Sequence, residues 1–417
     1  MKLLSDNKVN LKKPVMIMAS NPHVKPLKGF DPKTALSVDE SFTRLMKTGD
    51  DMLGDELDDF IEGTPGNGNS GKECGALRTG GAIHSGFAKI ELKSGRVVFA
   101  ATNLKGELFF FEPAGDNLKV SGKIMLQGSL YSPPVYNDGI IYCVAREGGA
   151  FAVDTGLKEA QGEPELISGR IIWQKRTKKG IFTEPVATGK VLLVTTLEGI
   201  YAFDAFNGPD RKIGEVLWGL SINGTVSTPV LHSGMLFIGS EDKKLMGFDY
   251  GGNKLKKTWE YDLSGACRSK PFVSEKSRQV VAGTIDGFVY SVARDTGAYK
   301  WNFVVKAPVL SSIVSSDIGG AEHLFFGADN GFFYCLNPEG KKVWEFRTNG
   351  KIRTEALIHE GRVYFGSEDN SFYALDLKSG KQIFTFRSDG NIYSRPLIHD
   401  RKVYFGSTDG FIHALYI

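Results

Sequence analysis

One short phrase recurs along this chain at nearly constant spacing. It is an apolar run that ends in glycine, followed by a turn and a second apolar run, and its last two copies read VYFGSEDNSFYAL and VYFGSTDGFIHAL. The five clearest copies have their glycines 44, 44, 39 and 40 residues apart. These glycines are Gly239, Gly283, Gly327, Gly366 and Gly406. Three weaker copies lie upstream, and eight copies at this period predict an all-β, eight-bladed β-propeller.

Each repeat predicts four short strands. The first carries a Ser or Thr, one variable residue and often Pro, which suits an edge strand because Pro has no N–H. Dipeptides such as Asp286-Gly287, Asn330-Gly331 and Asp409-Gly410 predict tight turns between the second and third strands. The predicted fourth strands contain all five tryptophans, with Phe384 at the equivalent place in blade seven, which indicates packing between blades. The tryptophans are Trp173, Trp218, Trp259, Trp301 and Trp344.

The ring needs one further strand to close. The last copy ends at Ile417 after its third strand, and Pro14–Ser20 is the strand-like segment found before the first blade. We therefore expect Pro14–Ser20 to pair with Phe411–Tyr416 and to remove the exposed edge. On this interpretation, deletion of residues 1–20 causes aggregation or strong destabilisation.

The chain divides into residues 1–20 (closing strand), 21–81 (acidic insertion) and 82–417 (propeller). Within the insertion, Ser37–Glu40 forms a capping box, and an amphipathic stretch follows from Asp50 to Glu62. Its acidic face gives a first set of candidate partner-binding residues: Asp50, Asp51, Asp55, Glu56, Asp58 and Asp59. We weigh three alternatives for this short α-helical element: packing on the propeller, docking to a basic partner, and disorder.

Gly63–Gly81 is rich in Gly, Asn and Ser and predicts a flexible linker open to proteolysis. Within it, Gly66–Glu73 nearly matches a phosphate-binding Walker A loop. That motif needs a preceding strand, a following helix and a Ser or Thr at its last position, where Glu73 stands. We therefore reject nucleotide binding.

The end of the repeat resembles a known family. The phrase Ala-[Leu/Phe]-Asp, then Gly, then Trp-x-Phe is similar to the tryptophan-docking phrase of the pyrroloquinoline-quinone-like (PQQ-like) propellers, here over about residues 82–417. It appears as Ala202–Asp204, as Ala374–Asp376 with Gly380, and as Gly297 with Trp301–Phe303. The family includes quinoprotein alcohol dehydrogenases and the outer-membrane assembly lipoprotein. The resemblance implies the propeller fold, and fold alone does not determine function.

The resemblance also implies what an enzymatic member needs. Those members hold the quinone between a Trp face and a disulfide of adjacent cysteines, bind Ca²⁺ through Glu, Asn and Asp, and use an Asp base. The cysteines here are far apart in sequence, and we can assign no Ca²⁺ ligand set. We expect no catalytic residues, no cofactor and no metal. The cysteines are Cys74, Cys143, Cys267 and Cys335.

The variable residue of the first-strand signature is often charged. It is Pro133, Glu184, Thr228, Lys270, Ser312, Glu355 and Arg395 along the blades. Ordinary polar decoration of an exposed edge is one interpretation, and a site for a small polar ligand or peptide is the other. Basic residues near blades seven and eight could also accept an acidic segment, including this chain's own. The second set of candidate partner-binding residues is Lys270, Lys351, Arg353, Glu355 and Arg395.

The charge balance and the N-terminus complete the functional expectation. The formal net charge of +3 gives no nucleic-acid footprint. The apolar run Val15–Ala19 is too short for a signal peptide or a membrane span, and no lipobox-type Cys is visible. We expect a cytoplasmic monomer without membrane association: a non-catalytic interaction scaffold or adaptor of a prokaryotic multi-protein system, with a regulatory or defence role as an option. The alternative is a PQQ- or metal-dependent enzyme, or a small-ligand sensor, that uses the central channel.

Overall fold

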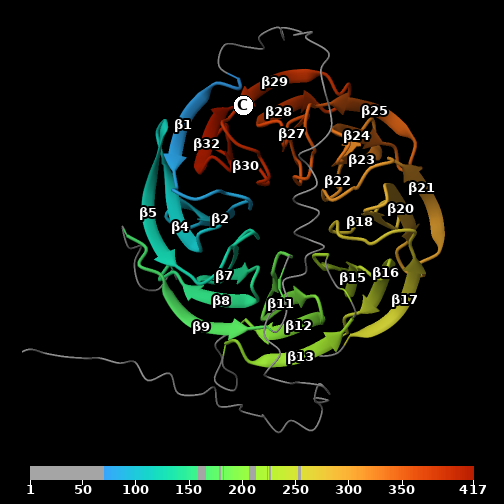
Figure 1. The fold of residues 1–417 in the computed structure, drawn as a ribbon, viewed down its shortest axis with the longest axis horizontal. Coiled ribbons are helices and arrows are strands. Elements are labelled where there is room, and N and C mark those ends of the chain that lie inside the picture. Colours follow the sequence, from blue (N-terminus) through green and yellow to red (C-terminus); the bar gives the residue numbers. More distant parts are fainter. Residues whose placement is uncertain are drawn as a thin grey trace, which may run out of the picture. The chain divides into compact units, whose positions relative to one another are not determined.

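The computed structural model describes residues 70–157, 166–177, 180–181, 183–205, 213–222, 224, 227–251 and 255–417. Every regular element in these ranges is a strand, and the strands form eight antiparallel sheets of four. The predicted eight-bladed propeller is therefore confirmed. Figure 1 shows the blades around a single axis, with their first strands near the axis and their fourth strands on the rim. The predicted helical insertion lies outside the described residues.

Each blade begins at the axis with two strands. The first strands are β2 (Ala88–Glu91), β6 (Val135–Asn137), β10 (Val186–Thr188), β14 (Val230–His232), β18 (Phe272–Ser274), β22 (Val314–Ile318), β26 (Leu357–His359) and β30 (Leu397–His399). The second strands are β3 (Val97–Thr102), β7 (Ile140–Ala145), β11 (Val191–Thr196), β15 (Met235–Gly239), β19 (Gln279–Gly283), β23 (Ala321–Gly327), β27 (Arg362–Gly366) and β31 (Lys402–Gly406).

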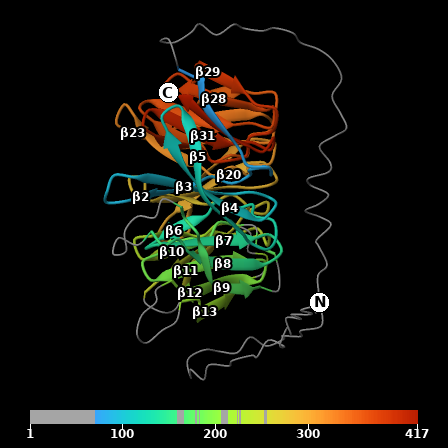
Figure 2. The same cartoon turned by 90° about the vertical axis from the view of Figure 1, so that its left-hand side faces the viewer.

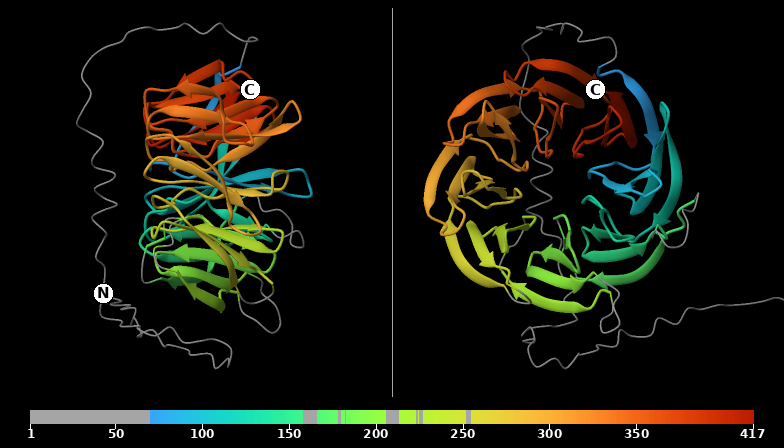
Figure 3. Two further views of the ribbon diagram at one scale, coloured as in Figure 1. Left: turned by 90° about the vertical axis from the view of Figure 1, so that its right-hand side faces the viewer. Right: turned by 180° about the vertical axis from the view of Figure 1, so that it is seen from behind.

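Two more strands carry each blade to the rim, as the side and rear views of Figure 3 show. The third strands are β4 (Glu107–Ala114), β8 (Gly149–Asp154), β12 (Gly199–Asp204), β16 (Lys244–Asp249), β20 (Phe288–Ala293), β24 (Phe332–Leu336), β28 (Ser371–Asp376) and β32 (Phe411–Tyr416). The fourth strands are β5 (Asn117–Met125), β9 (Arg170–Arg176), β13 (Val216–Ser221), β17 (Lys256–Asp262), β21 (Tyr299–Val304), β25 (Lys342–Arg347), β29 (Gln382–Arg387) and β1 (Glu73–Arg78).

The hydrophobic core lies between neighbouring blades, where second and third strands face each other. Phe333 of blade six stacks on Phe365 of blade seven with ring centroids 4.2 Å apart. Phe372 of blade seven stacks on Phe405 of blade eight at 4.1 Å. All four rings are fully buried. The strongly apolar second and third strands are therefore explained by burial on both faces of each sheet.

The fourth-strand tryptophans dock each blade on the next, as the sequence predicts. Trp301 of blade five donates its indole N–H to the carbonyl of Pro338 in blade six at 2.9 Å. Its ring lies against Gly340, where an added Cβ would come within 2.4 Å of the indole. Trp344 repeats the arrangement on Leu377 and Gly380 of blade seven. Glycine is required at these turns because the ring occupies the space of a side chain.

Two blades make the same contact without an aromatic ring. In blade one, Gly122 faces Phe110 at the strand position that Trp occupies elsewhere, and its backbone bridges to Ile167 of blade two. In blade eight, Gly75 takes that position and approaches the backbone of Asp116 in blade one. Direct contact between backbones therefore replaces indole packing at these two junctions.

The strand that closes the ring differs from the prediction. β1 pairs with β32 through Gly75–Ala414, Ala76–His413 and Leu77–Ile412, while β31 takes the other edge of β32. Because both edges of β32 are occupied, the predicted pairing of Pro14–Ser20 with Phe411–Tyr416 is wrong. Figure 2 shows β1 among the C-terminal strands. Closure by a strand preceding blade one is confirmed, but that strand lies in the stretch 63–81 that we interpreted as a flexible linker.

Candidate functional site

In the first-strand signature, the Ser or Thr holds the backbone in place, so that the variable residue after it lies beside the channel. In five blades the proline comes just before the inner strand and not within it, as at Pro229 and Pro396. The signature hydroxyl is buried and bonds to the second strand of its own blade: Ser394 Oγ accepts from the N–H of Gly406 at 2.6 Å, and Thr354 from Gly366 at 3.3 Å. The signature hydroxyls therefore have a structural role.

The variable residues meet in one group of charges, which we call the channel cluster: Glu184, Lys270, Glu355 and Arg395. Arg395 Nη1 lies 3.1 Å from Glu355 Oε1. Lys270 Nζ lies 3.7 Å from Glu355 Oε2 and 4.0 Å from Glu184 Oε2. Three of the predicted candidates, Lys270, Glu355 and Arg395, are thus brought together from blades five, seven and eight.

The charged side chains of the channel cluster pair with one another. Burial alone would raise the pKa of Glu355, but Lys270 and Arg395 outweigh that effect and the pKa is lowered. Burial acts against the charged form of Arg395, yet Glu184 and Glu355 keep its pKa raised. Glu355 and Arg395 are therefore held in their charged forms, in a cluster that contains two acidic and two basic side chains.

Two open hollows adjoin the cluster, and the Glu355 side chain lines both. One has a volume of about 550 Å³ and the other about 340 Å³. Their walls are mostly apolar, and Val314 and Ser315 of β22 also line both hollows. The other lining residues of the larger hollow are Phe87, Ala356, Leu357, Ile358, His359, Arg395, Pro396, Leu397 and Ile398.

Arg353, a further candidate, belongs to a separate ion group. Its guanidinium binds both carboxylate oxygens of Asp329, at 2.8 and 2.7 Å, and contacts Glu368 at 3.1 Å. Lys351 accepts a backbone hydrogen bond from Glu368 at 2.9 Å. Burial raises the pKa of Glu368 despite Arg353 and Lys351. The predicted grouping of Lys351 and Arg353 with Arg395 is therefore not seen, since Arg353 pairs with acids of blades six and seven.

Sequence reasoning missed the acidic partners. Asp329 and Glu368 each stand two residues after the repeat glycine, and so does Glu241, which binds Arg268. Arg268 and Arg353 each directly precede a signature Ser or Thr. An acid two residues after the glycine of one blade, with Arg before the signature of the next, is therefore the signal that could have found these pairs.

Aromatic side chains stand at the same pre-signature position in other blades. His84 stacks on Tyr393 with ring centroids 4.6 Å apart and meets Tyr131 edge-on at 5.2 Å. Burial lowers the pKa of His84 to about 4. This histidine is consequently neutral at physiological pH and acts as an aromatic packing residue.

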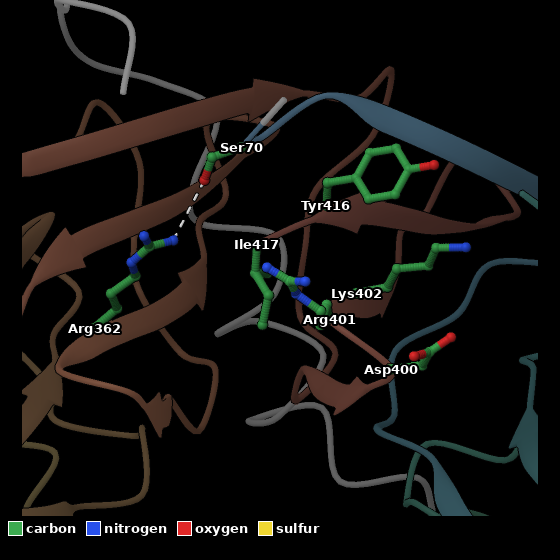
Figure 4. Close-up of a pocket in the computed structure, with 7 residues that line it drawn as sticks. All are labelled: Ser70, Arg362, Asp400, Arg401, Lys402, Tyr416 and Ile417. Carbon is green, nitrogen blue, oxygen red and sulfur yellow. Dashed lines mark hydrogen bonds between the residues drawn. The ribbon is translucent and has the colours of Figure 1, made fainter. Parts of the chain in front are cut away.

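A third feature is an open pocket of about 570 Å³ beside the closing strand, which we call the seam pocket (Figure 4). It is lined by Ser70, Arg362, Asp400, Arg401, Lys402, Tyr416 and Ile417. Arg362 Nη1 donates to Ser70 Oγ at 3.3 Å. None of these residues was among the predicted candidates, because the pocket brings Ser70, which precedes β1, together with residues of blades seven and eight.

The described residues contain no group of three or more His, Cys, Asp or Glu side chains placed to hold a metal ion. Cys74, Cys143, Cys267 and Cys335 are free thiols, and burial raises the pKa of Cys267 to about 12. In the same part of the chain, no helix is long and apolar enough to cross a membrane. The acidic candidates Asp50, Asp51, Asp55, Glu56, Asp58 and Asp59 lie outside the described residues.

Comparison with known proteins identifies related sequences. A family model described as outer membrane protein assembly factor BamB matches residues 209–321 and 285–417, which together make up just over half of the chain. The outer membrane protein assembly factor BamB of Burkholderia pseudomallei is 26% identical over 207 residues, which are 47% of this chain and 52% of that protein. The chain thus matches about half the length of this curated relative.

Solved structures share the fold. BamB from Moraxella catarrhalis has a TM-score of 0.53 at 17% identity and covers 81% of this chain and 86% of its own. A europium-containing methanol dehydrogenase has a TM-score of 0.61 at 12% identity over 80% of this chain and 85% of its own. At these identities the likeness concerns architecture alone, so the enzyme alternative stays untested.

The comparisons correct one prediction. The expected cytoplasmic location is wrong, because the matching family and its curated member are both named for outer membrane protein assembly. The same names remove support for the expectation of no membrane association. The apolar content of the N-terminus was a poor guide to location.

Proposed function

This chain belongs to the PQQ-like repeat family of the outer membrane protein assembly factor BamB, and on that premise we propose that it is a non-catalytic protein-interaction scaffold. A propeller suits this role because its blades hold many loops and edges in fixed positions. Its partners, on this proposal, are proteins that assemble the outer membrane, as the family name suggests.

The channel cluster is the observation that carries the proposal. A propeller enzyme needs chemically available groups in its channel, with pKa values matched to proton transfer. Here the charged channel groups from four blades pair with one another, and the pKa values of Glu355 and Arg395 are shifted toward the permanently charged forms. Such groups stabilise the ring and are poor general acids or bases. The outer surfaces of the blades are left as the functional surfaces.

The test is affinity capture of the tagged full-length chain from its native cells after mild crosslinking. We expect proteins of the outer membrane assembly machinery to be recovered in near-stoichiometric amounts, and the chain to fractionate with the cell envelope. A second arm adds PQQ with Ca²⁺ to the purified protein and measures dye-linked dehydrogenase activity. Activity in the second arm, with no envelope partner in the first, would overturn the proposal.

A further inference from the structure

The seam pocket places two guanidinium groups from neighbouring blades around one opening. Arg362 begins β27 in blade seven, and Arg401 lies in the turn between β30 and β31 of blade eight. Figure 4 shows Arg362 and Arg401 on either side of the opening, with Asp400 beyond Arg401. The Tyr416 and Ile417 side chains add apolar surface to the wall.

The third cation of the pocket is already neutralised. Lys402 Nζ lies 3.1 Å from Asp116 Oδ1 and donates to the carbonyl of Gly115. Tyr416 also donates its hydroxyl to Asp116 at 2.5 Å. These contacts join blade eight to blade one and leave Lys402 with a structural role. The charge available to a ligand therefore comes from Arg362 and Arg401.

Both arginines have unused hydrogen-bonding capacity. Arg362 contacts two neutral hydroxyls, that of Ser70 at 3.3 Å and that of Tyr364. Arg401 is exposed, and within the described part of the chain its guanidinium makes no hydrogen bond or ion pair. A guanidinium presents five N–H donors in a planar fork that matches a carboxylate. Two such forks on one opening favour an acidic ligand.

The backbone conformation at Arg401 is one that residues with a side chain seldom adopt. Arg401 has φ 56°, in the left-handed region that an L-residue rarely adopts. The corresponding second turn residue in four other hairpins is glycine: Gly139, Gly234, Gly320 and Gly361. Arg401 thus places a charged side chain at a turn position that glycine fills in these hairpins.

We propose that the seam pocket binds a carboxylate-rich segment of a protein partner, an inference that rests on the proposed scaffold function. Arg362 and Arg401 pair with acidic side chains, while Tyr416 and Ile417 contact the apolar residue between them. A volume of about 570 Å³ accommodates a few side chains. The partner thereby contacts blades seven and eight at the junction that closes the ring.

The test measures fluorescence anisotropy of a labelled Glu-Leu-Glu-Leu-Glu peptide with the full-length chain. Arg401→Gly is the decisive variant, because glycine accepts the left-handed backbone and the protein should melt at the same or a higher temperature. We expect Arg401→Gly and Arg362→Gln each to weaken binding about tenfold, as the loss of a charged pair implies. The matched control is Arg278→Gly, which removes one charge, paired with Asp295, at φ 48° in a blade five hairpin and should leave binding unchanged.

Three outcomes overturn the site assignment: no binding of the acidic peptide, equal binding of its Gln-Leu-Gln-Leu-Gln analogue, or equal loss in Arg278→Gly and Arg401→Gly. A second variant neutralises the acidic residues of this chain's own N-terminal segment: Asp50, Asp51, Asp55, Glu56, Asp58 and Asp59. If it binds the peptide ten times more tightly than the wild type, the pocket is assigned to that segment, and its assignment to a partner protein is overturned. If Arg401→Gly still captures envelope partners, the scaffold function stands and the assignment of the seam pocket as the partner site is rejected. If wild type captures none, the scaffold function falls by itself.

Discussion

At the scale of single residues, Glu355 connects the two cations of the channel. Its substitution by Gln keeps the shape but leaves Lys270 and Arg395 facing each other without their shared carboxylate. Loss of one partner of a buried ion pair is strongly destabilising. Because these side chains are about one-fifth to one-third exposed, we expect Glu355→Gln to lower the free energy of unfolding by about 2 kcal/mol at pH 7, measured by urea denaturation.

The pH dependence of that difference follows from the lowered pKa of Glu355. A carboxyl with a lower pKa in the folded chain adds stability above its unfolded pKa, near 4.3, and loses it as the pH falls through the folded pKa. The gap between wild type and Glu355→Gln should therefore narrow below pH 4. Glu345→Gln, which removes a rim partner of Lys342, should have little effect at any pH. A gap that stays constant down to pH 3 would contradict the role given to Glu355.

Residue offsets explain how much of the site could be predicted. Lys270, Glu355 and Arg395 share one position in the repeat, so the ring symmetry brings them to one axis. Arg353 occupies a different position, two residues before Glu355, and therefore points to other partners. Arg401 could not be identified from the sequence as a candidate binding residue. Its place in the seam pocket depends on its backbone angle and on Ser70, which lies at the other end of the described chain.

At the scale of elements, one glycine at a blade junction and one in the turn between β26 and β27 separate two effects of an added methyl group. Gly340 and Gly361 have φ 78° and 74°, but only Gly340 lies under an indole ring. Gly361→Ala should cost about 1 kcal/mol from backbone strain alone. Gly340→Ala should cost about 2–4 kcal/mol, because Trp301 must also move. Chemical denaturation of the two variants would measure this difference, and equal losses would argue against docking through Trp301.

The strand elements were readily predicted and the closing strand was not. Inner strands, turns and tryptophan strands each carry a signal that recurs in several blades. The closing strand β1 occurs once, and its side chains contribute little to the core beyond Cys74 and Leu77. It is held largely by backbone hydrogen bonds, which almost any sequence can make. The more apolar Val15–Ala19 was therefore the better strand by composition and the wrong one in the fold.

At the scale of the whole molecule, the ring is closed by one short strand that lies far in sequence from the strand with which it pairs. Glu73 and His413, 340 residues apart, lie 2.7 Å from each other across the seam, and Cys74 Sγ donates to Ala414 at 3.2 Å. Blade eight therefore depends for its stability on β1, which supplies its fourth strand and belongs to no other blade. Ser70, which shortly precedes this strand, lines the seam pocket, so the proposed partner site lies next to the ring closure.

Two deletions test where closure resides. Removal of residues 70–79 takes away β1 and exposes the edge of β32, an unpaired strand edge that invites aggregation. We expect this variant to lose its single cooperative thermal transition and to elute as aggregate in size-exclusion chromatography. Removal of residues 1–20 leaves β1 in place and should preserve both the transition and the elution volume. If the 1–20 deletion aggregates while the 70–79 deletion melts as wild type does, closure by Glu73–Arg78 is refuted, because the edge of β32 would then be covered by another segment.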